Sequence, residues 1–291
     1  MMDQYYDNGH LNQIIQEAIV EDVGLGDITT ESIVSPDLLG HGEMLAKEQG
    51  IVAGIEISEK IFHFIDPELR FKQFIADGSI VDTNTIIGSV DGSFGSILRA
   101  ERTVLNIVQR MSGIATMTAK FVEAVRGTQA KITDTRKTAP GLRLLDKLSV
   151  KLGGGTNHRF GLDDMVLIKD NHIAAAGGIL QAIELCLNYL LTKKYKIKIE
   201  VETKNLDEMK EVLKFTEIRR IMLDNYSIDE MKKAVELIGH RVEVEASGNV
   251  TLQNVRTVAE TGVDFISVGA LTHSPKALDI SLKVIHLPKS V

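Results

Sequence analysis

The second half of the chain alternates short strand-like runs with helical segments. After Gly127 the runs read KITDT, MVLIKD, IKIEVET, RRIMLD, RVEVEAS and DFISVGA, and helical patterns such as SIDEMKKAVELIG separate them. Strands that alternate with helices of this length predict βαβ units and a parallel sheet. The last four runs start roughly 22 to 24 residues apart, which is short for a doubly wound domain and natural for an α/β barrel.

Polar residues stand at the ends of these runs, where packing in a buried core would not require them. In parallel α/β folds, ligands bind at the carboxyl ends of the strands. The repeats therefore predict one mouth, the opening of the barrel at the carboxyl ends of its strands, that is lined by cations from the early strands and carboxylates from the middle strands. The residues at these ends are Asp134 and Arg136, Lys169 and Asp170, Glu200 and Glu202, Asp224 and Asn225, Glu245 and Ser247, and finally Gly269.

The first half of the chain has a different pattern. From about Gly42 to Asp91, short runs rich in Val, Ile and Phe are broken by Gly and Asp, and the helical pattern EISEKIFHFI lies between them. This half predicts a small α+β domain. From Ser96 to about Arg126, apolar residues recur at helical spacing and predict one or two long helices, which Gly113 would separate if there are two.

Composition restricts the partners and the compartment. The chain has 291 residues and is 44% hydrophobic, which allows a large core. Its net charge of -7 and pI of 5.7 argue against nucleic acid and anionic membranes as partners and favour small anions. The single Cys186 cannot form an internal disulfide, and the opening residues lack a signal-peptide pattern, so we expect a cytoplasmic protein. No apolar run approaches the length that spans a bilayer.

The segment from Thr133 to Ile173 is basic although the chain as a whole is acidic. Its Gly, Pro and Asn residues indicate loops. Arg and Lys side chains on loops are what proteins use to hold carboxylates and phosphates. The segment therefore predicts a small substrate that carries several negative charges. The basic residues are Arg136, Lys137, Arg143, Lys147, Lys151, His158, Arg159, Lys169 and His172.

Three motifs of this segment can each be interpreted in two ways. Arg136 and Lys137 directly follow a strand, and the turn at Pro140 keeps them out of a helix, but a solvated loop with weak ion pairs is an equal alternative. GGGTNHR allows a close backbone approach to a ligand and then offers donors, whereas its alternative is a flexible linker. In VLIKDNHI, Lys169 follows an apolar run and should point into the mouth, while His172 is more typical of a structural role.

Carboxylates and glycines follow the later strands. Glu200 and Glu202 lie two apart on one strand and share a face, while Glu202 and Asp224 end neighbouring strands. Such carboxylates suit Mg²⁺ bound to phosphate, or sugar hydroxyls; the alternative is internal pairing with Lys169 or Arg219. In EASGN and SVGALTHS, glycine and small hydroxyl residues follow the last two strands, which is an arrangement that binds phosphate through backbone N–H groups.

Taken in order, the motifs AERTVLN, DTRKTAPGLR, GGGTNHR, VLIKDNHI, IEVET, IMLDN, EASGN and DFISVGALTHS closely resemble the quinolinate phosphoribosyltransferase family. The resemblance extends from about Glu21 to Ser274. It implies an N-terminal α/β sandwich over residues 1–115, completed by the tail 275–291, and an incomplete α/β barrel of parallel strands over 116–274. It also implies phosphoribosyl transfer from phosphoribosyl pyrophosphate to quinolinate with Mg²⁺, giving nicotinate mononucleotide, CO₂ and pyrophosphate in NAD biosynthesis.

The resemblance also implies roles for single residues and a homodimer, or a larger assembly, with shared active sites. Quinolinate would be bound by Arg136, His158, Arg159 and Lys169 of one subunit and by Arg102 of the other. Lys137, Glu202 and Asp224 would be catalytic and would face the ribose and Mg²⁺. The 5′-phosphate would be surrounded by Ser247, Gly248, Asn249, Gly269, Ala270 and His273. The family often has a second glycine where Asn249 stands and an aromatic residue where Asp163 stands.

Two alternatives stay open on the sequence alone. A related phosphoribosyltransferase of the same fold could act on a monocarboxylate ring, although a single negative charge should need fewer cations than this chain offers. A non-catalytic anion-binding barrel is the second alternative. Against it stand Glu202 and Asp224, which an anion-binding protein should avoid unless a metal lies between them.

Overall fold

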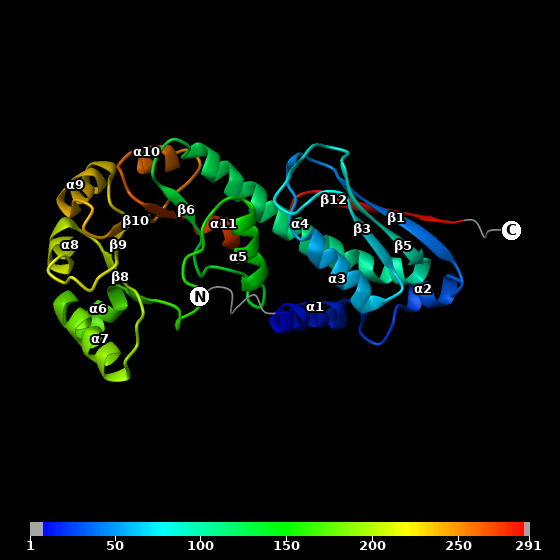
Figure 1. The fold of residues 1–291 in the computed structure, drawn as a ribbon, viewed down its shortest axis with the longest axis horizontal. Coiled ribbons are helices and arrows are strands. Elements are labelled where there is room, and N and C mark those ends of the chain that lie inside the picture. Colours follow the sequence, from blue (N-terminus) through cyan, green and yellow to red (C-terminus); the bar gives the residue numbers. More distant parts are fainter. Residues whose placement is uncertain (1–7, 288–291) are drawn as a thin grey trace. The chain divides into compact units, whose positions relative to one another are not determined.

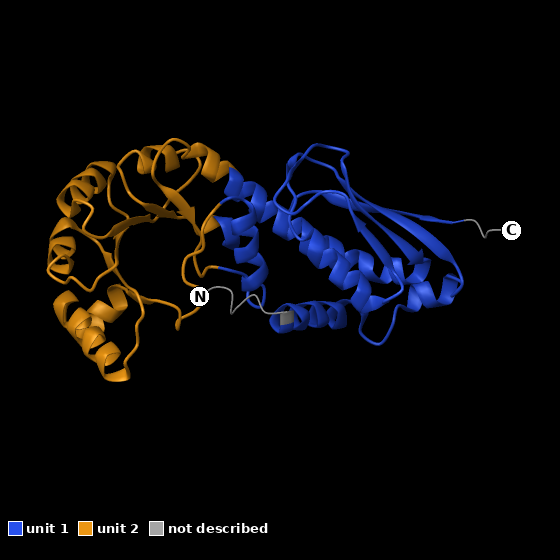
Figure 2. Ribbon diagram, in the orientation of Figure 1, with its two compact units in different colours: residues 1–119, 138–154, 271–291 blue, residues 120–137, 155–270 orange. Residues whose placement is uncertain are grey.

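The computed structural model describes residues 8–287. These residues divide into two compact units (Figure 2). The first unit takes its residues from 1–119, 138–154 and 271–291, and the second takes them from 120–137 and 155–270. Each unit therefore combines segments that are far apart in the sequence.

The first unit contains an antiparallel sheet in the order β12-β1-β5-β3 (Figure 1). Strand β1 alternates partly exposed and buried residues, as expected for a strand with one face on a core. Ala46 of β1 pairs with Ile280 of β12, so the last strand of the chain lies beside the first. The strands are β1 (Leu39–Ala46), β3 (Arg70–Gln73), β5 (Ile86–Ser93) and β12 (Ile280–His286), and β2 (Gly50–Ile51) pairs separately with β4 (Ile80–Val81).

Helix α4 (Phe94–Ala124) is continuous over 31 residues, so the first of the two alternatives, one long helix, is confirmed, and Gly113 does not interrupt it. The glycine has a different function. A Cβ at this position would overlap the backbone oxygen of Lys276 and lie 3.0 Å from Ala277 Cα, so only glycine allows the C-terminal segment to approach the helix this closely. The other helices of this unit are α1 (Asn8–Val23), α2 (Ile28–Ile33), α3 (Ile55–Ile65) and α5 (Arg143–Leu152), while α11 (Ala270–His273) begins at the last residue of the second unit.

The second unit is built on a curved, six-stranded parallel sheet (Figure 1). Its order is β6-β11-β10-β9-β8-β7, which is the order of a barrel in which β6 and β7 do not pair. The predicted open α/β barrel is therefore confirmed. The strands are β6 (Lys131–Thr133), β7 (Val166–Ile168), β8 (Ile199–Thr203), β9 (Arg220–Asp224), β10 (Glu243–Ser247) and β11 (Phe265–Ser267).

Helices follow these strands and lie along the outside of the curve (Figure 1). They are α6 (Asp170–Ala176), α7 (Ile179–Lys193), α8 (Leu206–Val212), α9 (Ile228–Ile238) and α10 (Val255–Ala259). Local signals fix their ends. Helix α9 begins with a capping box in which Ser227 and Glu230 bond each other's backbone N–H, and it ends at Gly239 with a left-handed φ of 57°.

The register of the sheet places charged residues side by side on one face. Arg220 of β9 pairs with Glu200 of β8 and with Glu243 of β10. Because side chains alternate along a strand, Glu202 lies on the same face as Glu200, and Glu245 on the same face as Glu243. Apolar residues occupy the opposite face and pack under the helices, where Val201, Ile221, Leu223, Val244 and Ala246 are all buried. The inner face of this barrel is therefore charged.

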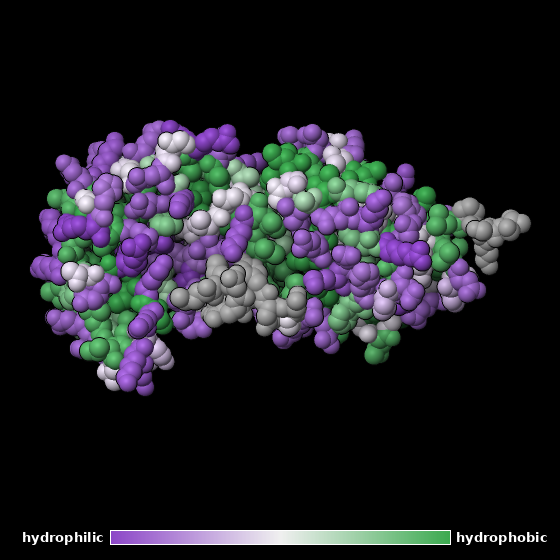
Figure 3. Space-filling view, viewed as in Figure 1, coloured by the Kyte–Doolittle hydropathy of each residue, from purple (hydrophilic) through white to green (hydrophobic). Residues whose placement is uncertain are grey.

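Hydrophilic and hydrophobic residues are interspersed on the face of the molecule that Figure 3 shows. Among residues 8–287, no single helix is both long and apolar enough to cross a bilayer. Helices α6 and α7 reach that length and composition only as a pair, and the pair is bent by 90°.

Candidate active site

A buried carboxylate at the end of β6 fixes the loop that carries Asn157, His158 and Arg159. Asp134 is fully buried, and its Oδ1 accepts the backbone N–H of His158 at 2.9 Å while Oδ2 accepts Asn157 Nδ2 at 2.5 Å. The same loop extends the sheet beside β6, because Thr156 donates its N–H to Ile132 O at 2.8 Å. The glycine-rich segment is therefore held in place at this point and is not a flexible linker.

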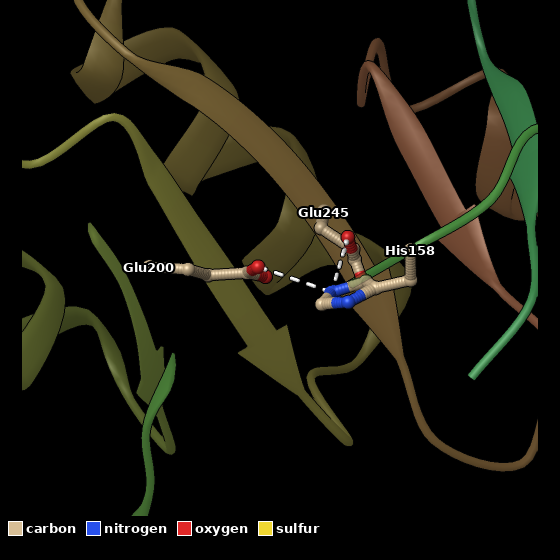
Figure 4. Close-up of side chains that lie close together, drawn as sticks. All are labelled: His158, Glu200 and Glu245. Carbon is tan, nitrogen blue, oxygen red and sulfur yellow. Dashed lines mark ion pairs between the residues drawn. The ribbon is translucent and has the colours of Figure 1, made fainter. Parts of the chain in front are cut away.

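The imidazole of His158 lies between two buried glutamates from the inner face of the sheet (Figure 4). His158 Nε2 is 3.1 Å from Glu200 Oε2 and 3.5 Å from Glu245 Oε2. Both glutamates have no exposed surface, and the histidine side chain is only 6% exposed. The opposite ring nitrogen, Nδ1, accepts the backbone N–H of Arg159 at 2.8 Å. Both ring nitrogens of His158 therefore face groups of the protein.

The two glutamates lie where a negative charge is costly. Burial, above all, raises the pKa of Glu200 to about 7, although Arg220 and Arg159 oppose this shift. Burial and the neighbouring Glu200 raise the pKa of Glu245 to about 7, while His158 and Arg220 oppose it. Near pH 7, neither carboxyl group is fully ionised.

Arg220 provides the counter-charge beside these glutamates. Its Nη1 donates to Glu245 Oε2 at 2.7 Å, and its Nη2 lies 3.3 Å from Glu243 Oε2. The guanidinium also stacks 3.8 Å above the ring centroid of Phe265 on β11. Arg220 is thus held from three sides, and it holds the Glu245 carboxylate in turn.

Two arginines lie close enough to repel each other. Burial, followed by the charge of Arg136, holds the pKa of Arg159 below its usual value. Arg159 Nη1 donates to Met165 O at 3.0 Å, which fixes one edge of its guanidinium. Arg136 Nε is buried and has no hydrogen-bond partner within residues 8–287. An anion that accepts from these donors would relieve both the repulsion and the buried N–H.

Lys169 points into the barrel from the end of β7, as predicted. Its Nζ lies 2.5 Å from Glu202 Oε2, so the internal pairing that was the alternative for Glu202 is present. Glu202 is almost buried, while the Lys169 side chain is 44% exposed and can reach a ligand. His172 accepts the backbone N–H of Lys169 at 2.9 Å and thereby caps α6, which is the structural role expected for it.

The loops after β9 and β10 are joined by side-chain amides. Asn249 Nδ2 donates to Asn225 Oδ1 at 3.0 Å, and Asn225 donates its backbone N–H to Ser247 O at 2.9 Å. Asn225 and Asn249 have left-handed φ values of 55° and 51°, which asparagine tolerates better than most residues. Gly248 between them has a φ of 101°. Asp224 and Ser247 are the last residues of β9 and β10 and pair with each other in the sheet, so both lie at the carboxyl ends of the strands.

The remaining predicted residues lie at several places. Lys137 is exposed, and its N–H donates to Thr135 Oγ1 at 3.0 Å. Gly269 follows β11 and Ala270 begins α11, both in the second unit. His273 is exposed and its Nδ1 lies 2.6 Å from Ser274 Oγ, and Arg102 is exposed on α4; both belong to the first unit. The second unit therefore brings together Arg136, His158, Arg159, Lys169, Glu202 and Glu245.

Sequence reasoning did not assign Asp134, Glu245 and Arg220 to the site. The polar strand-end pattern included Asp134 and Glu245, and that signal could have identified them. Arg220 gave no such signal, because it begins its strand and reaches Glu245 only through the sheet register.

Comparison with known proteins gives consistent results over nearly the whole chain. Residues 27–112 match the model of the quinolinate phosphoribosyl transferase N-terminal domain, and residues 114–283 match that of its C-terminal domain. The mitochondrial quinolinate phosphoribosyltransferase (decarboxylating) 2 of Nicotiana glauca is 49% identical, over 94% of this chain and 82% of its own. The probable nicotinate-nucleotide pyrophosphorylase (carboxylating) of Synechocystis is 43% identical, over 93% and 91%.

A solved structure is also similar. The nicotinate-nucleotide pyrophosphorylase of Francisella tularensis superposes with a TM-score of 0.90 at 37% identity, covering 96% of this chain and 97% of its own. Matches of both domain models together span the two halves of the sequence, and the fold agrees with them. The chain therefore belongs to the quinolinate phosphoribosyltransferase family.

Proposed function

We propose that this protein transfers the phosphoribosyl group of phosphoribosyl pyrophosphate to quinolinate and releases CO₂, giving nicotinate mononucleotide for NAD biosynthesis. The observation that supports this most is the pair Arg136 and Arg159. The two guanidiniums repel each other, and the buried Nε of Arg136 has no partner among the described residues. A ligand with two adjacent carboxylates would satisfy both arginines.

The quinolinate end of the site combines these arginines with Lys169. Lys169 is half-exposed beside Glu202, so its ammonium can contact a bound carboxylate without leaving the glutamate. His158 belongs to the same set through Arg159, because its buried ring accepts the backbone N–H of Arg159 at Nδ1. Arg102 on α4 is exposed, and we assign it to the active site of a partner subunit, so that a homodimer is the smallest active assembly.

The phosphoribosyl end of the site lies at the neighbouring strand ends. Glu202 and Asp224 face the ribose and Lys137 faces the pyrophosphate. Carboxylate oxygens at adjacent strand ends are the donor type that Mg²⁺ prefers, so Glu202 and Asp224 fit a magnesium ion that enters with the substrate. That ion would supply positive charge to the leaving pyrophosphate. The 5′-phosphate is proposed to bind to Ser247, Gly248, Asn249, Gly269, Ala270 and His273.

Positioning and electrostatics would provide most of the catalysis. Loss of pyrophosphate from the anomeric carbon develops positive charge on the sugar, which the carboxylates of Glu202 and Asp224 would stabilise. The cations at the other end hold the quinolinate nitrogen in line with that carbon. Once the nitrogen is ribosylated, its positive charge stabilises the electron pair that the departing CO₂ leaves on the adjacent ring carbon, and a proton from water then replaces the lost carboxylate.

We also propose that the protein acts in the cytoplasm. The proposal rests on the acidic composition and on the single Cys186, which leaves no internal disulfide to form. Plant relatives are named as mitochondrial or chloroplastic, so fractionation of cells that express the chain with its own N-terminus would test the compartment.

A product assay tests the activity. Purified protein would be incubated with Mg²⁺, phosphoribosyl pyrophosphate and either quinolinate or nicotinate, while CO₂ and mononucleotide are measured. Mononucleotide and CO₂ from quinolinate alone are expected. Product from nicotinate would assign the chain to the monocarboxylate enzymes, and the absence of product from either ring would favour a non-catalytic anion-binding protein.

A further inference from the structure

Glu200 and Glu245 have no part in the proposed reaction, and both flank His158, whose Nδ1 accepts the backbone N–H of Arg159. The ligand-type atoms of this trio, His158, Glu200 and Glu245, lie within 4.8 Å of one another, and all three residues are buried. One histidine and two carboxylates could in principle bind a metal ion. The position of the proton on the His158 ring argues against a metal ion here.

A backbone N–H can only donate a hydrogen bond. Because Arg159 N donates to His158 Nδ1 at 2.8 Å, Nδ1 carries no proton, and the proton of the neutral ring lies on Nε2. Nε2 is the atom that faces Glu200 and Glu245. A metal ion at Nε2 would need that nitrogen without its proton and a proton on Nδ1, where the Arg159 N–H leaves no room for one. The trio is therefore arranged around an N–H group.

We propose that Glu200 and Glu245 are positioning residues that hold His158 as its Nε2–H tautomer, so that Nδ1 fixes the backbone of Arg159 at the quinolinate site. The inference rests on the proposed function for the role of Arg159. Glu200 is fully buried, neither of its oxygens accepts a hydrogen bond within the described part of the chain, and its Oε2 lies 3.1 Å from His158 Nε2, so it acts on the imidazole electrostatically. A carboxylate placed in this way stabilises an N–H that points toward it.

Arg220 anchors this arrangement from the neighbouring strand. It is stacked on Phe265 and bound to Glu245, so the carboxylate cannot turn away from the imidazole. The backbone of Arg159 is thus fixed through His158, and its guanidinium is fixed separately by Met165 O. Arg159 is held at both ends before any ligand arrives, which reduces the entropy lost on binding.

Two pairs of variants test the inference through the Michaelis constants. In Glu245→Gln the amide can offer an N–H to Nε2, which favours the wrong tautomer; we expect the KM for quinolinate to rise about tenfold and the KM for phosphoribosyl pyrophosphate to stay within about twofold. Glu243→Gln is the matched control, because Glu243 lies on the same face of β10 and contacts Arg220 but not His158. Its KM for quinolinate should not change.

The second pair replaces the ring itself. Asparagine can present an oxygen near the place of Nδ1, whereas glutamine extends past it toward Nε2. His158→Asn should therefore bind quinolinate about fivefold more tightly than His158→Gln. The opposite order, or an unchanged KM in Glu245→Gln, would overturn the positioning role.

Nitrogen-15 NMR of the histidine rings gives a result that does not depend on activity. The chain has 8 histidines, and His158→Asn identifies the signal of His158 by its loss. We expect the Nε2–H pattern in the native protein and its loss in Glu245→Gln. An Nδ1–H pattern, or stoichiometric metal that survives dialysis in the native protein and is lost in Glu245→Gln, would refute the inference. If quinolinate proves not to be a substrate while the Nε2–H pattern is present, only the proposed function fails.

Discussion

Gly248 offers a sharp test of the loop that follows β10. Its φ of 101° lies in the region that costs a residue with a side chain about 1–2 kcal/mol. A Cβ at this position would also lie 2.5 Å from Asn225 Cγ, so the Asn225 amide would have to move. That amide accepts the 3.0 Å hydrogen bond from Asn249, and its loss costs about 1 kcal/mol. Gly248→Ala should therefore lower the free energy of unfolding by about 2–3 kcal/mol.

The same displacement should weaken the binding of the 5′-phosphate. If about 1.4 kcal/mol of this free energy is expressed in binding, the KM for phosphoribosyl pyrophosphate rises about tenfold. Initial rates of CO₂ release at varied phosphoribosyl pyrophosphate and saturating quinolinate would measure it, and urea unfolding would measure the stability.

Gly239→Ala is the matched control. Gly239 also has a left-handed φ, 57°, but its nearest neighbour in space would be Glu236 O at 3.7 Å, and it ends α9 away from the carboxyl ends of the strands. We expect a loss of about 1–2 kcal/mol in stability and an unchanged KM. An equal rise in KM for both variants, or none for Gly248→Ala despite its loss of stability, would refute the reasoning.

Three further predictions concern charged side chains. Arg136→Ala should raise the KM for quinolinate about ten- to hundredfold without lowering the melting temperature, because it removes charge-assisted hydrogen bonds to the ligand only; a normal KM in initial-rate assays would contradict its assignment. Asp146→Asn should lower the free energy of unfolding in urea by about 3 kcal/mol, because buried Asp146 accepts two hydrogen bonds of 2.8 Å from Arg110. Asp207→Asn, in an exposed pair with Lys210, should lower it by less than about 0.5 kcal/mol. Equal losses in the two variants would contradict this reasoning. In the folded protein the pKa of Glu245 is raised to about 7 from 4.5, so the unfolded chain releases this proton at lower pH, and stability on the order of 3 kcal/mol should be lost as pH rises from 4.5 to 7. Urea unfolding at several pH values should therefore show a weaker dependence of stability on pH for Glu245→Gln. An equally steep dependence would show that other groups cause it.

The strands of the second unit could be predicted because two independent patterns agree there. Short apolar runs recur at a constant interval, and polar residues follow them where a parallel sheet exposes its carboxyl ends. Lys169 illustrates this: it directly follows a buried strand, and the structure has it pointing into the barrel toward Glu202. A local pattern is sufficient when the position of a side chain depends on its own strand alone.

The arrangement around His158 could not be predicted in the same way. Whether His158 contacts a ligand or the protein depends on a backbone N–H of the next residue and on two glutamates that are 42 and 87 residues away. The role of Gly113 could not be predicted for a similar reason. A glycine inside a helical pattern can mark a break or a close approach, and only the position of Lys276 distinguishes the two.

One experiment can show whether the charged side chains inside the barrel contribute to stability or to quinolinate binding. Barrels of this type ordinarily pack branched apolar side chains inside, and buried ion pairs are often no more stable than apolar residues of similar size. We therefore expect the double variant Arg220→Met, Glu245→Leu to unfold at the same urea concentration as the native protein or higher. Its KM for quinolinate should nevertheless rise about tenfold, because His158 would lose the carboxylate that orients it. A large loss of stability with an unchanged KM would mean that these charges serve the fold and not Arg159.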